Sequence, residues 1–200
     1  MLNVKNAEMA DLEQIMKIYR YAQDYMIKSG NPTQWGHFYP DADLIKSDID
    51  KNACKVIYDK DGIHGVFSVF DGTEPTYKHI EGGNWLNEEP YLTIHRLAGD
   101  GQVHGLFPCA LNYCKKISLN IRVDTHADNK TMQRMIEKNG FIKCGTIYVK
   151  NGTARIAYQR ADFRAARFAS ISLNTTRSAA RSVSSSVDRH SDNWKEIVER

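Results

Sequence analysis

The chain of 200 residues is 42% hydrophobic and 26% charged, a composition that supports one folded domain with its own core. Its 27 Lys and Arg residues are dispersed among 24 Asp and Glu, so the formal net charge of +3 argues against a nucleic-acid partner. No stretch approaches the ~18 apolar residues of a membrane span, and the first residues lack the apolar core of a signal peptide.

The spacing of apolar residues predicts the first half of the secondary structure. A short strand near the N-terminus precedes a helix that Gly30 ends, and Asp41 caps a second helix. The period then changes to two, which predicts a hairpin of strands at 54–58 and 65–70.

The second half of the fold continues the pattern. Strands are expected at 91–97 and 121–125, each followed by a helix, and a final hairpin pairs 141–148 with 155–159. The order is β-α-α-β-β-β-α-β-α-β-β, with a helical crossover between two strands near the middle. This order predicts an α/β fold of the α+β kind, in which a mixed sheet has helices on both faces.

The composition changes from Ala161 onward to Ser, Arg and Ala without a sustained period. Such a segment is typical of a flexible or loosely docked tail. We therefore divide the chain into a domain at 1–160 and a tail at 161–200.

The four cysteines, Cys54, Cys109, Cys114 and Cys144, form no C-x-x-C pair and have no His at zinc-finger spacing. Free thiols in a reducing compartment are expected, rather than disulfides or a metal site. The sequence thus predicts a cytoplasmic protein without a metal.

The segment Leu97 to Phe107 joins a predicted strand to a predicted helix and contains Gly99, Gly101 and Gly105. Glycines let backbone N–H groups approach an anion closely, and the start of a helix offers unpaired donors. A diphosphate is the expected ligand. The loop lacks the Gly-Lys-Ser/Thr ending of a Walker loop, and its glycines miss the dinucleotide-binding spacing.

Two motifs carry a family resemblance. The loop reads Gln102-x-x-Gly105-x-Phe107, and a second segment runs from Asn129-Lys130-x-Met132 to Gly140-Phe141. With both motifs in this order, nearly all of residues 1 to 160 resembles the GNAT superfamily of acetyl-CoA-dependent N-acetyltransferases. The superfamily has Gly or Ala where this chain has Phe107.

The resemblance implies a mostly antiparallel sheet of six to seven strands flanked by helices. The strand that ends at Leu97 and the strand that begins at Ile121 would form a parallel pair that splays apart to bind CoA. The residues that the resemblance assigns to CoA are Arg96, Leu97, Gln102, Val103, His104, Gly105, Leu106, Phe107, Asn129 and Met132.

Acetyl transfer needs an unprotonated amine and a proton for the leaving thiolate. Many GNAT enzymes supply the proton from a Tyr whose matching position here is Ile136, so another group must act. His95 is a candidate base on the strand beside the expected acetyl group, or a structural histidine. Glu81 is a second candidate base, an anchor for a cationic substrate, or a solvated acid. Tyr148 is a candidate proton donor, or a packed surface residue.

Aromatic residues gather in the irregular segments that would cover the acceptor. They form either a substrate wall or a small satellite core, and they are Trp35, Tyr39, Tyr77, Trp85 and, at the neighbouring strand, Tyr91.

The expected function is direct acetyl transfer from acetyl-CoA to a primary amine, on a small molecule or an amino acid-like acceptor. No cysteine occupies an obvious nucleophile position, which argues against an acyl-enzyme. A catalytically weak acyl-CoA-binding regulatory module and a protein or peptide N-acetyltransferase remain open alternatives, and so does a homodimer.

Overall fold

Seven strands form one mixed sheet in the computed structural model, which describes residues 1–72 and 74–161. The strand order is β1-β2-β3-β4-β5-β7-β6, and every neighbouring pair is antiparallel except β4 and β5. The strands are β1 (Asn3–Asn6), β2 (Cys54–Asp59), β3 (Gly62–Asp71), β4 (Leu92–Gly99), β5 (Asn120–Thr125), β6 (Ile142–Tyr148) and β7 (Ala154–Ala161). The predicted mixed, mostly antiparallel sheet is confirmed.

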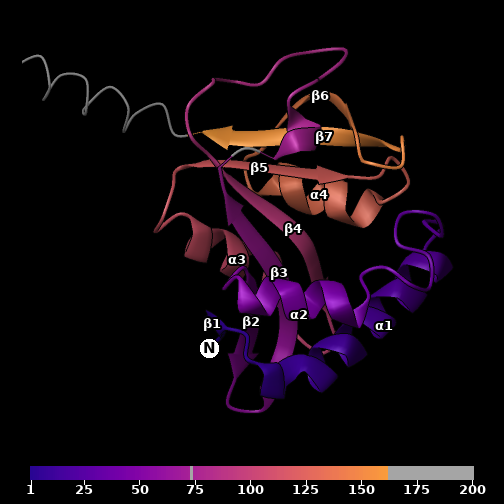
Figure 1. Ribbon diagram of the computed structural model, residues 1–200, viewed down its shortest axis with the longest axis vertical. Helices are drawn as coiled ribbons and strands as arrows, with labels where there is room; N and C mark the ends of the chain where they lie inside the picture. Colours follow the sequence, from indigo (N-terminus) through magenta and orange to yellow (C-terminus); the bar gives the residue numbers. More distant parts are fainter. Residues whose placement is uncertain (73, 162–200) are drawn as a thin grey trace, which may run out of the picture. The chain divides into compact units, whose positions relative to one another are not determined.

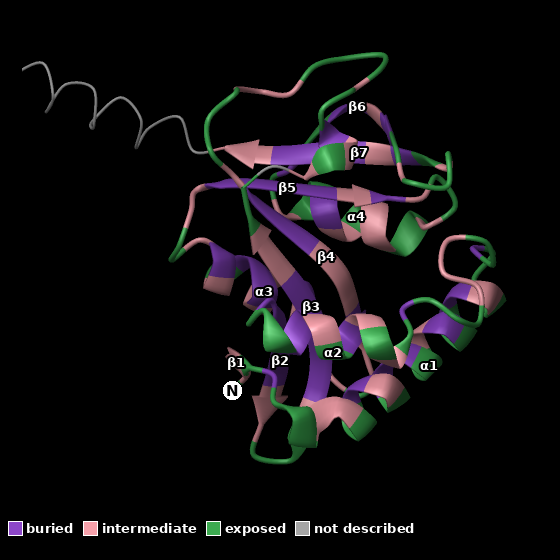
Figure 2. Ribbon diagram, in the orientation of Figure 1, coloured by how far each residue is buried: buried purple, intermediate pink, exposed green. Residues whose placement is uncertain are grey.

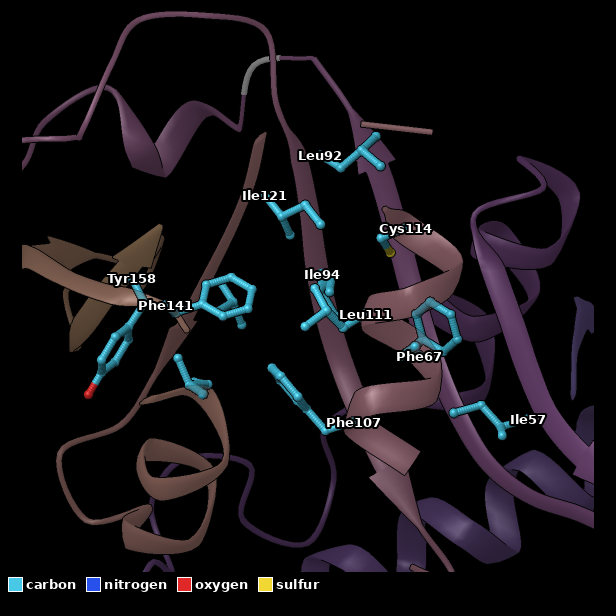
Figure 3. Close-up of a cluster of buried hydrophobic side chains, with 13 residues drawn as sticks. Ile57, Phe67, Leu92, Ile94, Phe107, Leu111, Cys114, Ile121, Phe141 and Tyr158 are labelled. Atoms are coloured by element: carbon cyan, nitrogen blue, oxygen red, sulfur yellow. The ribbon is translucent and has the colours of Figure 1, made fainter. Parts of the chain in front are cut away.

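Helices α3 (Leu106–Cys114) and α4 (Lys130–Lys138) cover one face of this sheet. Alternate strand residues such as Ile57 and Phe67 point into a core with these helices, shown in Figure 3. We call this side the α3/α4 face. Buried residues follow the strands and the inner sides of the helices, whereas most loops are exposed (Figure 2).

The opposite face has two coverings. Helices α1 (Leu12–Lys28) and α2 (Ala42–Asp50) pack on β2, β3 and β4, where Val56 and Val66 point into a second core. Farther along the sheet, the connection between β3 and β4 covers β6 and β7 through the short 3-10 helix η2 (Pro75–Tyr77). We call this side the acceptor face.

The tail predicted at 161–200 lies outside the described residues except for Ala161, which ends β7. Among the described helices, none is both long and apolar enough to cross a membrane. The short helical turn η1 (Met9–Asp11) precedes α1 and completes the described elements.

Strands β4 and β5 part soon after they meet, as Figure 1 shows. Their parallel register contains only the pairs Leu92–Ile121 and Thr93–Arg122. On its other side, β4 pairs with β3 through an irregularity between Val66 and Ser68. The predicted splayed pair is therefore present, and it opens beyond Thr93.

Candidate active site

The point where β4 and β5 diverge brings together side chains from distant parts of the sequence. Thr93 is paired with Arg122, so the next residues on the same side of each strand are His95 and Asp124. Leu92 and Ile94 belong to the core on the α3/α4 face, which places His95 on the acceptor face. His95 and Asp124 thus flank the opening from two strands.

His95 is oriented by a carboxylate that the sequence did not single out. Its Nε2 lies 3.3 Å from Oε2 of Glu74, and both side chains are partly buried. The hydrogen bond with His95, assisted by those from Thr76, lowers the pKa of Glu74 to about 2. An ionised carboxylate only accepts, so Nε2 carries the proton and Nδ1 of a neutral imidazole is left as an acceptor.

Tyr77 lies at the centre of an aromatic cluster on the acceptor face. It is only 2% exposed, and its hydroxyl donates to Oδ1 of Asp124 at 2.7 Å. Its ring lies near those of Trp85, Tyr91 and His95, with centroids 5.1, 6.3 and 6.2 Å away. Packing therefore dominates at Tyr77 and Trp85, and a substrate role for these aromatic residues stays a prediction.

Arg122 is buried between two of these rings. Its guanidinium carbon lies 4.0 Å from the ring centre of Trp85 and 3.8 Å from that of Tyr91, and one terminal nitrogen donates to the carbonyl of Asn87. Burial lowers the pKa of Arg122. The cation–π contacts hold the connection between β3 and β4 against the sheet.

The irregular part of β4 is fixed by Arg96, one of the residues assigned to CoA. Arg96 has a φ of 54°, a left-handed conformation that costs free energy in a non-glycine residue. Its guanidinium is ion-paired with Asp48 of α2, and its carbonyl accepts a hydrogen bond of 3.1 Å from the Tyr19 hydroxyl. Ser68 also donates to Asp48, at 2.7 Å. These contacts hold the strand in a shape that favours the opening beside Leu97.

The loop between β4 and α3 offers backbone donors. Gly105 precedes α3 with a φ of 88°, and no side chain of residues 1–72 or 74–161 caps the helix. No described residue accepts a hydrogen bond from the amides of residues 103 to 107, which comprise Val103, His104, Gly105, Leu106 and Phe107. Free amides at a helix start fit a diphosphate, because they supply both hydrogen bonds and the positive end of the helix dipole.

The acidic side chain of this loop, Asp100, lies next to a histidine. Asp100 accepts a hydrogen bond of 2.9 Å from the amide of Gln102, and its other oxygen lies 2.8 Å from Nδ1 of His64. The second ring nitrogen of His64 lies 3.0 Å from Asp59. The hydrogen bond with Asp100 raises the pKa of His64 most strongly. The raised pKa favours the protonated form of His64, whose positive charge would offset part of the negative charge of Asp100.

Phe107 departs from the small residue of the resembled motif, and the structure places its side chain in the core. It is 2% exposed and meets the ring of Phe141 edge-on, with centroids 6.0 Å apart (Figure 3). The Phe107 ring lies in the core between the sheet and helices α3 and α4. Its backbone amide has no hydrogen-bond acceptor among the described residues. The large side chain is therefore compatible with a ligand on the loop amides.

The second motif spans α4 and begins at the cap of this helix. Asn129 caps this helix through a hydrogen bond of 3.0 Å from the amide of Met132, and Met132 packs against the core on the α3/α4 face. The Asn129 amide group also donates to Gln34, at 3.0 Å. This contact joins the segment between α1 and α2 to the predicted CoA-binding side.

Two of the candidate catalytic residues lie away from the opening. The Tyr148 hydroxyl donates to Glu81 at 2.9 Å, and the backbone of Glu81 pairs with Thr146 at the outer edge of β6. The hydrogen bonds from His79 and Tyr148 lower the pKa of Glu81, while Glu81 raises that of Tyr148. Strand β7 separates them from β5, about 10 Å away at ordinary strand spacing. Their catalytic roles stay predictions.

Two aromatic residues of the segment between α1 and α2 also differ in setting. Trp35 packs against Tyr19 with centroids 5.8 Å apart and joins the second core. Tyr39 is 41% exposed and accepts a hydrogen bond of 3.2 Å from Arg96. Of the two, Tyr39 is better placed to meet an acceptor.

The sequence reasoning missed Glu74, Asp48 and Asp124. Asp124 had a usable signal, because it alternates with apolar residues in Ile121-Arg122-Val123-Asp124 and so indicates one polar face of a buried strand. Glu74 had none, since it lies in an irregular segment far along the chain from His95.

Solved structures resemble this fold closely. An acetyltransferase of the GNAT family from Streptococcus agalactiae is 30% identical, with a TM-score of 0.74, and the match covers 80% of this chain and 95% of that one. A putative acetyltransferase from Staphylococcus aureus is 27% identical, with a TM-score of 0.58 and coverage of 79% and 97%. A putative acetyltransferase from Salmonella typhimurium, solved with its cofactor acetyl-CoA, shares the fold at 15% identity, with a TM-score of 0.54 and coverage of 80% and 94%.

Comparison with protein-family models gives no match, and comparison with curated proteins gives none either. The structural likeness nevertheless defines the class of the protein as an acyltransferase of the N-acetyltransferase type. The chain belongs to the GNAT family, since its likeness to the streptococcal member spans nearly the whole of that protein at 30% identity.

Proposed function

We propose that the protein transfers an acetyl group directly from acetyl-CoA to a primary amine on a small or amino acid-like acceptor. The observation that carries the proposal is the opening between β4 and β5, with the free amides of residues 103 to 107 on one side and the His95–Glu74 pair on the other. The amides suit the diphosphate of CoA, and the pair suits removal of a proton from the nitrogen of the attacking amine.

The residues divide the reaction between them. The amine attacks the thioester carbonyl, the new C–N bond replaces the C–S bond, and the thiolate leaves. His95 Nδ1 accepts a proton from the amine, while Glu74 holds the imidazole and stabilises its charged form. Asp124, held by Tyr77, offers a second carboxylate next to the incoming cation.

Direct transfer is supported by the state of the thiols. Burial raises the pKa of Cys54 and of Cys114 to about 12, and it also raises the pKa of Cys109 and Cys144. A thiol with a raised pKa holds little thiolate at neutral pH and is a poor nucleophile. An acyl-enzyme on cysteine is therefore disfavoured.

Glu81 fits an anchoring role better than that of the base. It is exposed at the edge of β6, and its lowered pKa makes it a weaker proton acceptor. We propose that it attracts cationic acceptors, while Tyr148 orients it.

We propose a cytoplasmic location because all four cysteines, which lie in the described residues, are free thiols. A homodimer remains a prediction that light scattering would test.

The test is release of free CoA from acetyl-CoA with and without a panel of amines, amino acids and short peptides. Acceptor-dependent release with formation of the N-acetyl product is expected. CoA binding without release for any acceptor would favour the regulatory module. Turnover confined to peptides would favour the peptide acetyltransferase.

A further inference from the structure

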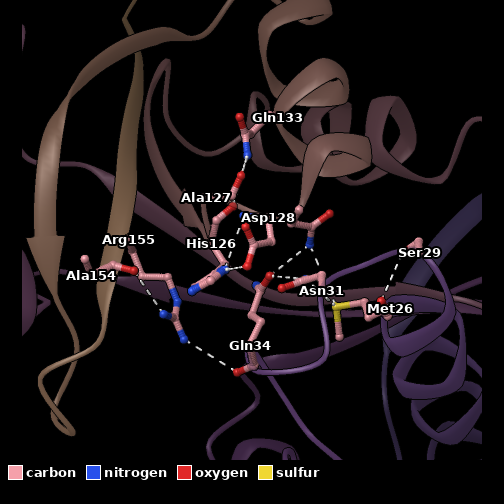
Figure 4. Close-up of polar contacts among 11 residues, drawn as sticks. Met26, Ser29, Asn31, Gln34, His126, Ala127, Asp128, Gln133, Ala154 and Arg155 are labelled. Carbon is pink, nitrogen blue, oxygen red and sulfur yellow. Dashed lines mark hydrogen bonds and ion pairs between the residues drawn. The ribbon is translucent and has the colours of Figure 1, made fainter.

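The acceptor face contains a buried arginine that forms no ion pair with a carboxylate of the described residues. Arg155 of β7 is 7% exposed. One terminal nitrogen donates to its neighbour's carbonyl, Ala154, at 3.1 Å, and the other donates to the carbonyl of Gln34 at 3.5 Å. No carboxylate oxygen of residues 1–72 or 74–161 lies within 4.0 Å of the guanidinium. Figure 4 shows this side chain reaching toward Gln34.

The other arginines on this face have stronger partners. Arg96 is ion-paired with Asp48, and Arg122 lies between the rings of Trp85 and Tyr91. Among the described residues Arg155 has neither kind of partner in contact, and burial lowers its pKa although the charge of the more distant Asp124 acts in the opposite direction. Buried charges in proteins are normally paired, because two carbonyl contacts do not replace a full hydration shell.

The register of the sheet places Arg155 beside the reacting groups. Asp124 of β5 is opposite Ala157 of β7, and Arg155 is two residues from Ala157 along the same strand. Arg155 and Asp124 are therefore diagonal neighbours on one face, which puts their Cα atoms about 7–8 Å apart. His95 flanks the same opening from β4. A small molecule that carries an amine and a carboxylate can therefore contact Asp124 with the amine and Arg155 with the carboxylate.

The segment that accepts from Arg155 also leads to the start of α4. The side-chain oxygen of Gln34 accepts hydrogen bonds from Asn31 at 2.8 Å and from Asn129 at 3.0 Å. Gln34 thus links Arg155 to the cap of α4, where Asn129 and Met132 are predicted to bind CoA (Figure 4). A ligand held by Arg155 would be next to the proposed acetyl group.

We propose that Arg155 binds the carboxylate of the acceptor, so that the substrate class is a small amino acid whose amine faces His95 and Asp124. This inference rests on the proposed acetyl transfer. The guanidinium presents several N–H groups in one plane, which suits a carboxylate and gives charge-assisted hydrogen bonds.

The test compares each amino acid with its primary amide and with the amine that lacks the carboxyl group. In the parent enzyme, kcat/KM should be about tenfold or more higher for the amino acid than for either analogue. In Arg155→Gln this preference should disappear through a higher KM for the amino acid, while the amide and the amine keep their rates. Arg155→Lys should restore part of the preference, and Arg20→Gln, an exposed change on α1, should leave it intact.

A second measurement avoids any risk that a variant fails to fold. Carboxylic acids that lack the amine should inhibit the parent enzyme competitively against the amino acid, whereas their amides should not. Equal rates for acids and amides in the parent, or an equal loss for all acceptors in Arg155→Gln, would overturn this inference while leaving acetyl transfer in place. Absence of turnover with every acceptor would instead overturn the proposed function.

Discussion

The two faces of the sheet are built differently around the same opened pair of strands. On the α3/α4 face, apolar side chains fill a core, and the groups offered to a ligand are backbone amides of residues 103 to 107. On the acceptor face, His95 and Asp124 lie next to the ring of Tyr77, and the buried Arg155 is a diagonal neighbour of Asp124 in the sheet.

The difference follows from what each side is proposed to recognise. A diphosphate is the same for every acyl-CoA, and a loop backbone supplies its hydrogen bonds whatever side chains surround it. An acceptor is recognised by its own charges, which only well-placed side chains can match. We therefore expect packing changes to damage the first face and charge changes to damage the second.

The largest effect is expected from Phe107→Ala. Removing a ring that is 2% exposed leaves a cavity beside Phe141, so the free energy of unfolding should fall by about 3–5 kcal/mol. Urea unfolding measures this value. Phe38→Ala, at a position 87% exposed, is the control and should change it by less than about 0.5 kcal/mol. Better CoA binding by Phe107→Ala without loss of stability would show that the ring obstructs the loop.

The next effect concerns the acceptor face. His95→Gln should lower kcat roughly 100-fold or more and leave the Kd for CoA unchanged, as expected for a general base. Glu74→Gln should lower kcat less, because the imidazole stays in place but loses its orienting charge. His37→Gln, an exposed change in the segment between α1 and α2, is the control.

Glu81→Gln, measured in the same kinetic assay, distinguishes an anchoring residue from the base. It should mainly raise the KM for a cationic amine. If kcat were to fall with Glu81→Gln and stay at the parent value with His95→Gln, the proposed base would have to move to the edge of β6.

A substitution in the loop of residues 103 to 107 should change the affinity for CoA and leave the acceptor face unaffected. Gly105→Asp should weaken CoA binding about tenfold, because a carboxylate next to the free amides repels the diphosphate. Gly105→Asn is the matched control, since Asn has nearly the same shape and tolerates the φ of 88°. Calorimetry with CoA distinguishes the two variants. Equal affinities for both would remove the diphosphate from this loop.

The smallest effect is a pH dependence at His64. Its pKa is raised in the folded protein, mainly by Asp100, so protonated His64 stabilises the fold fully below its unfolded pKa of about 6.5. That contribution is lost as the pH rises through the folded pKa. Urea unfolding at pH 6 and pH 9 should show a decrease in stability for the parent that is smaller in His64→Gln. The same decrease in both proteins would exclude His64 as its source.

The sequence predicted those features that depend on neighbours along the chain. The helices and strands follow from apolar periods, and the loop ending at Gly105 combines glycines with a helix start, so both lie within short windows of sequence. The splayed pair of β4 and β5 came from the family resemblance rather than from these patterns. His95 could be placed on its strand because alternation assigns a face to each strand residue.

The tertiary structure alone decided which distant residues meet. Glu74 reaches His95 across 21 positions, Asp48 reaches Arg96 across 48, and Arg155 reaches Gln34 across 121. The packing of α2 and of two connecting segments on the sheet brings these groups together, and such packing is not encoded in a local period. The same holds for Phe107, which stands where the superfamily has Gly or Ala, because only the direction of its side chain in α3 puts the ring in the core.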